Sequence, residues 1–207
     1  MNLNHQLLSE TLIDAIADNL SAKGYVLLED FLVDDLATSL QAEALSLSTQ
    51  TFKTAGIGRQ NNQQINGKIR TDSTLWLEGS SDCQQRYLDL MEQLRIGLNR
   101  RLFLGLFDFE CHYSHYKKGD FYKTHLDAFK GQSNRILSTV FYLNHQWQAN
   151  DGGELVLYSA EQHSELEVVT PTFNRCILFL SERFPHEVQV SNRDRLSIAG
   201  WFRINRS

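Results

Sequence analysis

The second half of the sequence is a succession of short β-rich runs separated by turn residues. Eight runs follow one another from about residue 106 onward: FECHYSHY, DFYKTHLD, RILSTVFYLN, GELVLYS, LEVVTP, RCILFLS, PHEVQV and RLSIAGWFRI. Strands of this length and spacing are typical of an antiparallel sandwich or a small barrel. Because few architectures accommodate so many short strands in a row, this pattern constrains the fold more than any other feature of the chain.

The first half of the sequence has the apolar spacing of helices instead. Residues 7–24 and 33–47 carry apolar side chains close to a period of about 3.6 residues. Residues 80–103 fit a third helix, with Ser81 or Asp82 as its N-cap. Helices first and strands after predict an α+β fold in which the helices pack on one face of the β core.

Composition bounds the class of protein. At 207 residues the chain fits one domain, residues 1–207, with helical support in 1–104 and a β core in 105–207. A hydrophobic fraction of 42% and a charged fraction of 22% are those of a globular chain. The net charge of -5 offers no basic footprint for nucleic acid and no polybasic patch for a membrane, so neither partner is expected.

The sequence also bears on the cellular compartment. No apolar run approaches the roughly 20 residues of a membrane span, and the N-terminal residues lack the basic start and cleavage site of a signal peptide. The cysteines, Cys83, Cys111 and Cys176, are odd in number and far apart, which argues against a disulfide framework or a cysteine-type zinc site. We therefore expect a cytoplasmic protein.

One long polar stretch separates the second and third predicted helices. Residues 54–79, TAGIGRQNNQQINGKIRTDSTLWLEG, are rich in Gly, Asn and Gln. Long loops of compact domains are often lids or binding loops, and a mobile surface loop explains this composition equally well. Both interpretations stay open on these residues alone.

The segment YKTHLDAF places a histidine and a carboxylate two positions apart, at His125 and Asp127. On a strand, side chains alternate between faces, so these two should point the same way. A facial iron site needs two histidines and one carboxylate, with open positions opposite them. A second histidine must therefore come from another strand.

The other histidines differ in how well they could complete such a site. Three fall in the N-terminal segment or near turns and loops: His5, His145 and His163. His112 and His115 are three residues apart on one predicted strand, so they point to opposite faces. His186 remains, before a strand-like run, although by itself it is better explained as a structural or surface histidine.

An arginine that follows His186 strengthens its case. The run that begins nine positions later has two faces, one with Arg195, Ser197, Ala199 and Trp201 and the other with Leu196, Ile198 and Phe202. The apolar face can pack on the helices, which sends Arg195 into the barrel. A buried guanidinium is costly unless it meets an anion, and it suits a carboxylate in bidentate fashion.

The order His125-x-Asp127, His186, Arg195 resembles the pattern of the Fe(II)- and 2-oxoglutarate-dependent dioxygenases, which have a double-stranded β-helix (jelly-roll) core. More narrowly, the chain is similar to the prolyl hydroxylases of the hypoxia-sensor type and their bacterial relatives. The resemblance runs from about residue 68 to 202 through KIRTDSTLWLEG, YKTHLD, STVFYLN, GGELVLY, FNRCILFLSERFPHEVQ and RLSIAGWF.

The resemblance implies a metal site and a cosubstrate site. His125, Asp127 and His186 would bind Fe(II), and Arg195 would hold the far carboxylate of 2-oxoglutarate. Arg193 is a rival anchor, but strand phase and the family's offset both favour Arg195. The implied cofactors are Fe(II), 2-oxoglutarate as cosubstrate and O2, with ascorbate as a further candidate.

The resemblance also implies the walls of the cosubstrate pocket. Tyr142 matches a tyrosine that hydrogen-bonds the same carboxylate, Leu155 and Trp201 match wall positions, and Tyr116 matches another pocket tyrosine. Ala199 stands where the animal enzymes carry a hydroxyl residue. That departure removes one hydrogen bond, of about 1 kcal/mol, without removing the anchor.

Around the mouth of the site, the resemblance implies substrate-binding roles for Arg70, Asp72, Trp76 and Arg135. The stretch GIGRQNNQQINGKIRTD matches a segment that folds over the substrate, and Asp72 would pair with Arg135 near the entrance. A surface salt bridge of little energetic weight is the plain alternative for that pair. For Trp76, core packing explains the residue about as well.

The activity implied is hydroxylation of a prolyl residue in an exposed loop of a protein substrate, with release of succinate and CO2. For the bacterial relatives, a translation elongation factor is the implied type of substrate. Two alternatives stay open: a 2-oxoglutarate dioxygenase acting on another residue or a small molecule, and a non-catalytic β-helix module that binds a partner. A cupin-like binding protein is weaker, because it does not predict the arginine after His186.

Overall fold

The computed structural model describes residues 7–47, 51–55, 67–128, 134–161 and 164–205. Its helices lie where the apolar spacing predicts them: α1 Glu10–Ala22, α2 Asp34–Ser46 and α3 Asp82–Leu102, with a short 3-10 helix at Ala149–Asp151. Side-chain caps begin two of them. Ser9 accepts a hydrogen bond from the backbone of Leu12, and Ser81 accepts one from Gln84, so the predicted N-cap of the third helix is confirmed.

The strands form two antiparallel sheets. The major sheet has the order β1-β9-β6-β11-β4-β3-β2, with bounds β1 Tyr25–Leu28, β9 Cys176–Leu180, β6 Arg135–Tyr142, β11 Arg195–Ile204, β4 Leu106–Tyr116, β3 Ser73–Trp76 and β2 Lys53–Thr54. The minor sheet has the order β5-β10-β7-β8, with bounds β5 Tyr122–His125, β10 His186–Val188, β7 Leu155–Tyr158 and β8 Glu165–Val169. This is the predicted α+β architecture, with a double-stranded β-helix core.

The eight strands predicted from the β-rich runs are all present, as β4 to β11. The pattern did not predict β1, a four-residue strand that follows the turn at Gly24, or the β2–β3 pair. That pair lies in the polar stretch 54–79, or just before it, and β3 joins the sheet by pairing with β4. Residues 56–66 of the stretch lie outside the described residues, so the two interpretations of that loop stay predictions.

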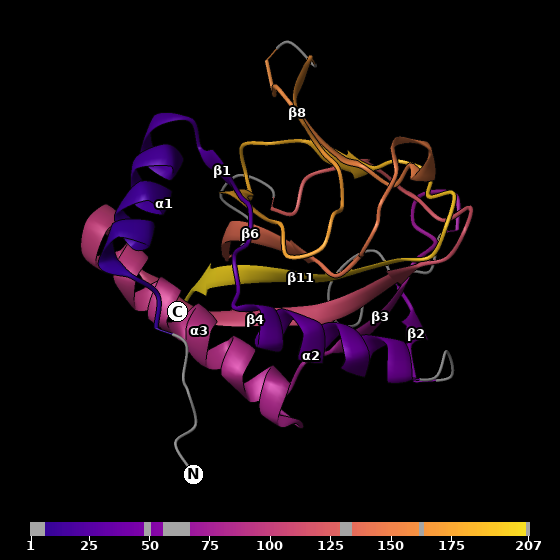
Figure 1. Cartoon of the computed structure of the whole chain (residues 1–207). Helices are drawn as coiled ribbons and strands as arrows, with labels where there is room; N and C mark the ends of the chain where they lie inside the picture. The colour runs from indigo at the N-terminus through magenta and orange to yellow at the C-terminus, as the bar shows by residue number, and fades with distance from the viewer. Residues whose placement is uncertain (1–6, 48–50, 56–66, 129–133, 162–163, 206–207) are drawn as a thin grey trace.

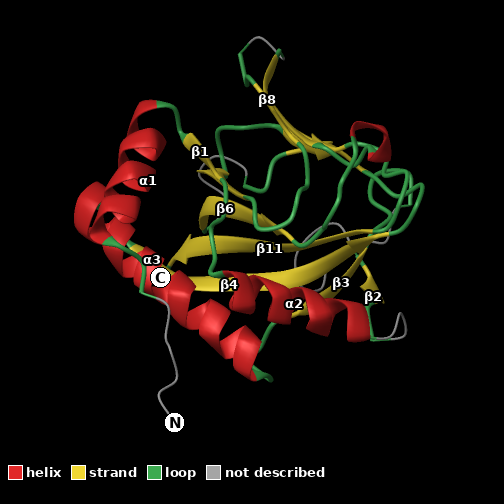
Figure 2. Ribbon diagram, in the orientation of Figure 1, coloured by secondary structure: helices red, strands yellow, loops and turns green. Residues whose placement is uncertain are grey.

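The helices cover one face of the major sheet, on the side away from the minor sheet (Figures 1 and 2). One apolar cluster joins Ile13, Leu36 and Leu94 of the three helices to Ile198 and Phe202 of β11. The other face of β11 is turned toward the minor sheet. The predicted division of this strand into an apolar and an inward polar face is therefore confirmed.

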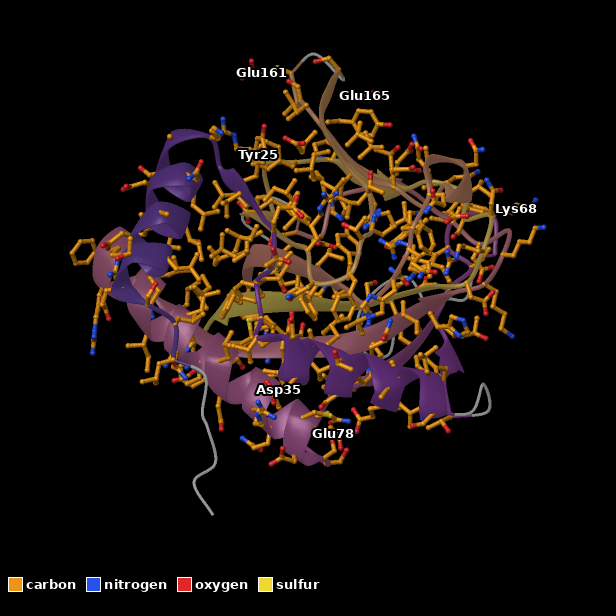
Figure 3. All side chains as sticks on the ribbon, in the orientation of Figure 1. Tyr25, Asp35, Lys68, Glu78, Glu161 and Glu165 are labelled. Atoms are coloured by element: carbon orange, nitrogen blue, oxygen red, sulfur yellow. The ribbon has the colours of Figure 1, made fainter. Side chains whose placement is uncertain are left out.

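Charged side chains lie at the periphery of the molecule. Figure 3 shows Asp35 and Glu78 at one edge, Lys68 at another, and Glu161 and Glu165 at the tip beside β8. Within the described ranges, none of the helices is both long enough and apolar enough to cross a membrane.

Gly200 lies at a point of close approach within the major sheet. A Cβ at this position would lie 2.8 Å from Cε2 of Phe109 and 2.9 Å from Cβ of Cys111. Gly200→Ala is therefore expected to lower the free energy of unfolding by about 1–3 kcal/mol, because the crowded ring has to move. Urea denaturation measures the change, and Gly67→Ala, where the new methyl group meets nothing within 4 Å, is the matched control. Equal stability of the two variants would contradict this packing.

Candidate functional site

Two strands of the minor sheet bring the candidate metal ligands together. His125, the last residue of β5, is the cross-strand partner of His186, the first residue of β10. Asp127 does not lie on the strand as expected, because β5 ends at His125 and the aspartate sits in the bend that follows. Its carboxylate still lies 3.7 Å from Nε2 of His125 and 3.6 Å from Nε2 of His186.

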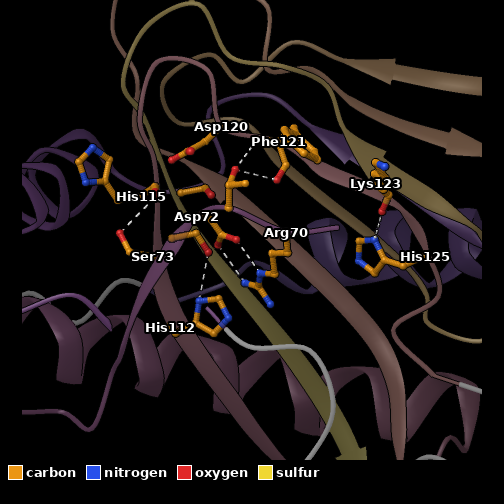
Figure 4. A network of polar contacts seen from close by, with 12 residues as sticks. Arg70, Asp72, Ser73, His112, His115, Asp120, Phe121, Lys123 and His125 are labelled. Carbon is orange, nitrogen blue, oxygen red and sulfur yellow. Dashed lines mark hydrogen bonds and ion pairs between the residues drawn. The ribbon is translucent and has the colours of Figure 1, made fainter. Parts of the chain in front are cut away.

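Backbone carbonyls orient both imidazoles. Nδ1 of His125 lies 2.8 Å from the carbonyl oxygen of Lys123, and Nδ1 of His186 lies 3.0 Å from that of Phe184 (Figure 4 shows the first contact). A carbonyl oxygen only accepts, so each Nδ1 carries the proton and donates. In the neutral form of each ring, Nε2 then keeps its lone pair and faces the carboxylate, which is the tautomer that a metal ligand requires.

The protonation states of the triad suit a divalent cation. Burial, with a smaller contribution from the neighbouring His186, lowers the pKa of His125 to about 3, so this imidazole is neutral at physiological pH. Burial alone would raise the pKa of Asp127, but the two imidazoles, Arg135 and a hydrogen bond from Ser138 hold it below its ordinary value. The three donor atoms lie within 4.8 Å of one another. Two imidazoles and one carboxylate form the donor set of a facial Fe(II) site.

Arg195 lies deep in the same part of the fold and is 1% exposed. Nη1 donates to Oγ of Ser197 at 3.2 Å, while Nε and Nη2 have no hydrogen-bond partner within the described part of the chain. The guanidinium stands over the rings of Tyr116 and Tyr142, at 4.9 and 5.1 Å from their centroids, and the hydroxyl of Tyr142 is also unpartnered there. Buried donors of this kind require an acceptor, and a carboxylate fits all of them.

The rival anchor, Arg193, points elsewhere. Its side chain is 44% exposed, and it forms an ion pair with Asp151 at 3.1 Å and stands over the ring of Trp147. A two-residue step along the chain therefore separates an arginine of the surface from one of the interior. The strand phase that favoured Arg195 is the phase found in the structure.

A single cavity of about 160 Å³ connects the triad to Arg195. The predicted wall positions Leu155 and Trp201 line it, as do Tyr116 and Ala199, whereas Tyr142 is not among the lining residues. Tyr142 contacts Arg195 with its ring and belongs to the apolar cluster between the two sheets. The cavity therefore offers a cation site and an anion site that one small dicarboxylate could reach together.

The predicted entrance residues are partly rearranged. Arg70, Trp76 and Arg135 line the cavity, but Asp72 is fully buried and pairs with Arg70, not with Arg135 (Figure 4). Arg135 pairs with Glu110 on β4 and stands 3.6 Å from the ring centroid of Trp201. The predicted Asp72 to Arg135 pair is wrong in this structure, because Arg70, two residues away, binds both oxygens of the carboxylate.

Two residues that contact the triad were not predicted from the sequence. Tyr122 stacks on His125, with ring centroids 3.5 Å apart, and Ser138 donates a hydrogen bond to Asp127. Strict alternation places Tyr122 on the face opposite His125, but the register of β5 and β10 shifts between these positions. Ser138 could have been found, since it shares a strand face with Tyr142.

Comparisons with known proteins agree with this geometry. The protein-family model described as "2OG-Fe(II) oxygenase superfamily" matches residues 111–203 of this chain. The crystal structure of a Pseudomonas putida prolyl-4-hydroxylase superposes with a TM-score of 0.84 at 37% identity, covering 94% of this chain and 100% of that one. A prolyl hydroxylase from Trichoplax adhaerens, solved with a hypoxia inducible factor peptide fragment, gives 0.81 at 25% identity, with 94% and 90% covered.

Curated relatives are similar over part of their length. Egl nine homolog 1 of Homo sapiens is 24% identical over 202 residues, which are 92% of this chain and 46% of the relative. Prolyl hydroxylase EGLN3 of Homo sapiens is 34% identical over 85 residues, which are 41% of this chain and 35% of the relative. This chain thus spans less than half of these curated relatives. The Pseudomonas putida prolyl-4-hydroxylase, by contrast, is matched over its full length. This match assigns the chain to the 2OG-Fe(II) oxygenase superfamily, in the group that contains the prolyl hydroxylases.

Proposed function

We propose that this protein is an Fe(II)- and 2-oxoglutarate-dependent dioxygenase that hydroxylates a prolyl residue of a protein substrate. The observation that carries the proposal is that one cavity contains two candidate binding sites, one for a metal ion and one for an anion. Three candidate metal-ligand side chains stand at one place, and at another stands a buried guanidinium whose Nε and Nη2 have no partner in the described part of the chain. A dicarboxylic acid that chelates a metal with one end and needs a cation at the other matches both.

Each site residue has a task in this proposal. His125, Asp127 and His186 would hold Fe(II). Bound iron and 2-oxoglutarate supply the oxidising chemistry, in which O2 puts one oxygen atom into succinate, formed with loss of CO2, and the other into a C–H bond of the substrate. Arg195 would bind the far carboxylate through its Nε–H and Nη2–H groups, which also orients the acid.

The remaining walls of the cavity supply further contacts and exclude water. Burial raises the pKa of Tyr142 to about 12, so its phenol stays protonated and can donate to the carboxylate beside Arg195. Burial likewise raises the pKa of Tyr116, which keeps its phenol neutral. Tyr116, Leu155 and Trp201 line the cavity and leave little room for solvent around the acid.

The substrate class is supported by the relatives. The Pseudomonas putida protein is a prolyl-4-hydroxylase, and the Trichoplax adhaerens prolyl hydroxylase was solved in complex with a hypoxia inducible factor peptide fragment. We infer that the mouth of the cavity, with Arg70, Trp76 and Arg135, faces an exposed proline-containing loop. A translation elongation factor as substrate and a cytoplasmic location stay proposals from the sequence. A hydroxylase of another residue or of a small molecule would use the same cavity.

Mass spectrometry of peptides tests the proposal. Purified protein is incubated with Fe(II), 2-oxoglutarate, ascorbate and a set of proline-containing peptides. We expect a gain of one oxygen atom on proline, matched by succinate, and none on peptides in which alanine replaces proline. Succinate formation without a modified peptide would contradict prolyl specificity, and oxidation of the alanine peptides would point to another residue. No turnover of 2-oxoglutarate with any substrate would contradict the reaction class.

A further inference from the structure

A buried pair of hydroxyl groups stands behind the carboxylate of the triad. Ser138 on β6 donates a hydrogen bond from Oγ to Oδ2 of Asp127 at 2.6 Å, and Oγ of Ser181 lies 2.9 Å from Oγ of Ser138. The two serines are 1% and 0% exposed. Hydroxyl groups are rarely placed in a core without a polar partner, and here the partner is a candidate metal ligand.

The direction of this hydrogen-bond chain follows from its members. An ionised carboxylate only accepts, so the single proton of the Ser138 hydroxyl is committed to Asp127. The contact between the serines can then form in one way, with Ser181 donating to Oγ of Ser138. Each bond polarises the next, so the donation to Oδ2 is stronger than that of an isolated hydroxyl.

The hydroxyl pair belongs to a different sheet from the histidines. His125 and His186 are on β5 and β10 of the minor sheet, whereas Ser138 is on β6 of the major sheet and Ser181 directly follows β9 of that sheet. The backbone N–H of Ser181 also donates to the carbonyl of Ile136 at 2.9 Å, which fixes it beside β6. Asp127, in its bend after β5, is therefore held from the opposite side of the cavity.

We propose that Ser138, supported by Ser181, is a positioning residue for the metal site. It fixes the rotation of the Asp127 carboxylate by engaging Oδ2, so that Oδ1 stays turned toward Nε2 of His125 at 3.7 Å and Oδ2 toward Nε2 of His186 at 3.6 Å. A side chain in a bend has no strand neighbours to orient it, which is why Asp127 needs this contact and the strand-borne histidines do not. The inference rests on the metal site of the proposed function.

Titration of the full chain with Mn(II), followed by electron paramagnetic resonance without substrate or 2-oxoglutarate, tests this role. Ser138→Ala is expected to weaken Mn(II) binding by about 10- to 100-fold, the range for loss of a partner that orients a ligand. Ser138→Thr keeps the hydroxyl and should bind within a few-fold of the wild type. Ser181→Ala should fall between them, because it removes only the support of Ser138.

Thr139 provides the matched control. It is the next residue of β6, is buried, and its hydroxyl has no hydrogen-bond partner among the described residues. Thr139→Val should leave Mn(II) affinity unchanged. Wild-type affinity in Ser138→Ala, or an equal loss in Thr139→Val, would overturn the inference, even if thermal unfolding midpoints fall. A wild-type protein that binds no Mn(II) would instead contradict the metal site itself.

Discussion

Arg195→Met is expected to raise the KM for 2-oxoglutarate by at least about a hundredfold, because it leaves the carboxylate of the acid buried without its partner. Methionine fills most of the same space, so the walls of the cavity should stay in place. Steady-state kinetics of 2-oxoglutarate turnover at saturating substrate measure the change. The expected split is a large rise in KM with a smaller fall in kcat, since Arg195 does not contact the substrate peptide in this proposal.

Stability separates this effect from misfolding. The guanidinium of Arg195 is buried, and two of its nitrogens have no hydrogen-bond partner among the residues that the structure describes. Its removal should therefore lower the free energy of unfolding by at most about 1 kcal/mol, which urea denaturation measures. Arg193→Met is the matched control, because that arginine is partly exposed and pairs with Asp151. A hundredfold rise in KM for Arg193→Met, or an unchanged KM for Arg195→Met, would contradict the assignment of the anchor.

His186→Ala is expected to lower Mn(II) affinity by more than about a hundredfold and to bring hydroxylation below detection. Loss of a partner that merely orients a ligand costs 10- to 100-fold, so loss of a ligand atom costs more. His186 is buried, and its Nε2 lies 3.6 Å from Oδ2 of Asp127. Titration by electron paramagnetic resonance and a succinate assay measure both effects.

His115→Ala is the control for this substitution. His115 sits on β4 and contacts Asp194 and the ring of Phe52, away from the triad. Its removal should leave Mn(II) affinity and turnover within a few-fold of the wild type. If the two variants bind Mn(II) equally well, His186 is not a ligand.

Strand phase made most of the site predictable from the sequence. Alternation on β11 places Arg195 and Trp201 inward and Ile198 outward, and the structure has this arrangement. The separation of His112 from His115 follows from the same rule. Alternation is a local property of the backbone, so it can be counted along the chain without knowledge of the fold.

Contacts that depend on tertiary placement could not be predicted in this way. From the sequence, Asp72 could pair with either Arg70 or Arg135. Its pairing with Arg70 depends on how the residues before β3 approach β5, where Arg70 forms a β-bridge with Tyr122. The stacking of Tyr122 on His125 depends on a register shift that cannot be predicted from the residue pattern. The strands β2 and β3 could not be predicted because their composition is polar: β3 is held by pairing with β4, and β2 by pairing with β3, which supply what local propensity does not.

The central claim is that a metal held by the triad and the guanidinium of Arg195 bind one molecule of 2-oxoglutarate together. Isothermal titration of 2-oxoglutarate into the protein, with Mn(II) present and with a chelator instead, tests it most directly. We expect saturable binding with Mn(II), at least about tenfold weaker binding with the chelator, and the loss of both in Arg195→Met. Equal affinity for 2-oxoglutarate with and without the metal, or no binding in either condition, would contradict the account.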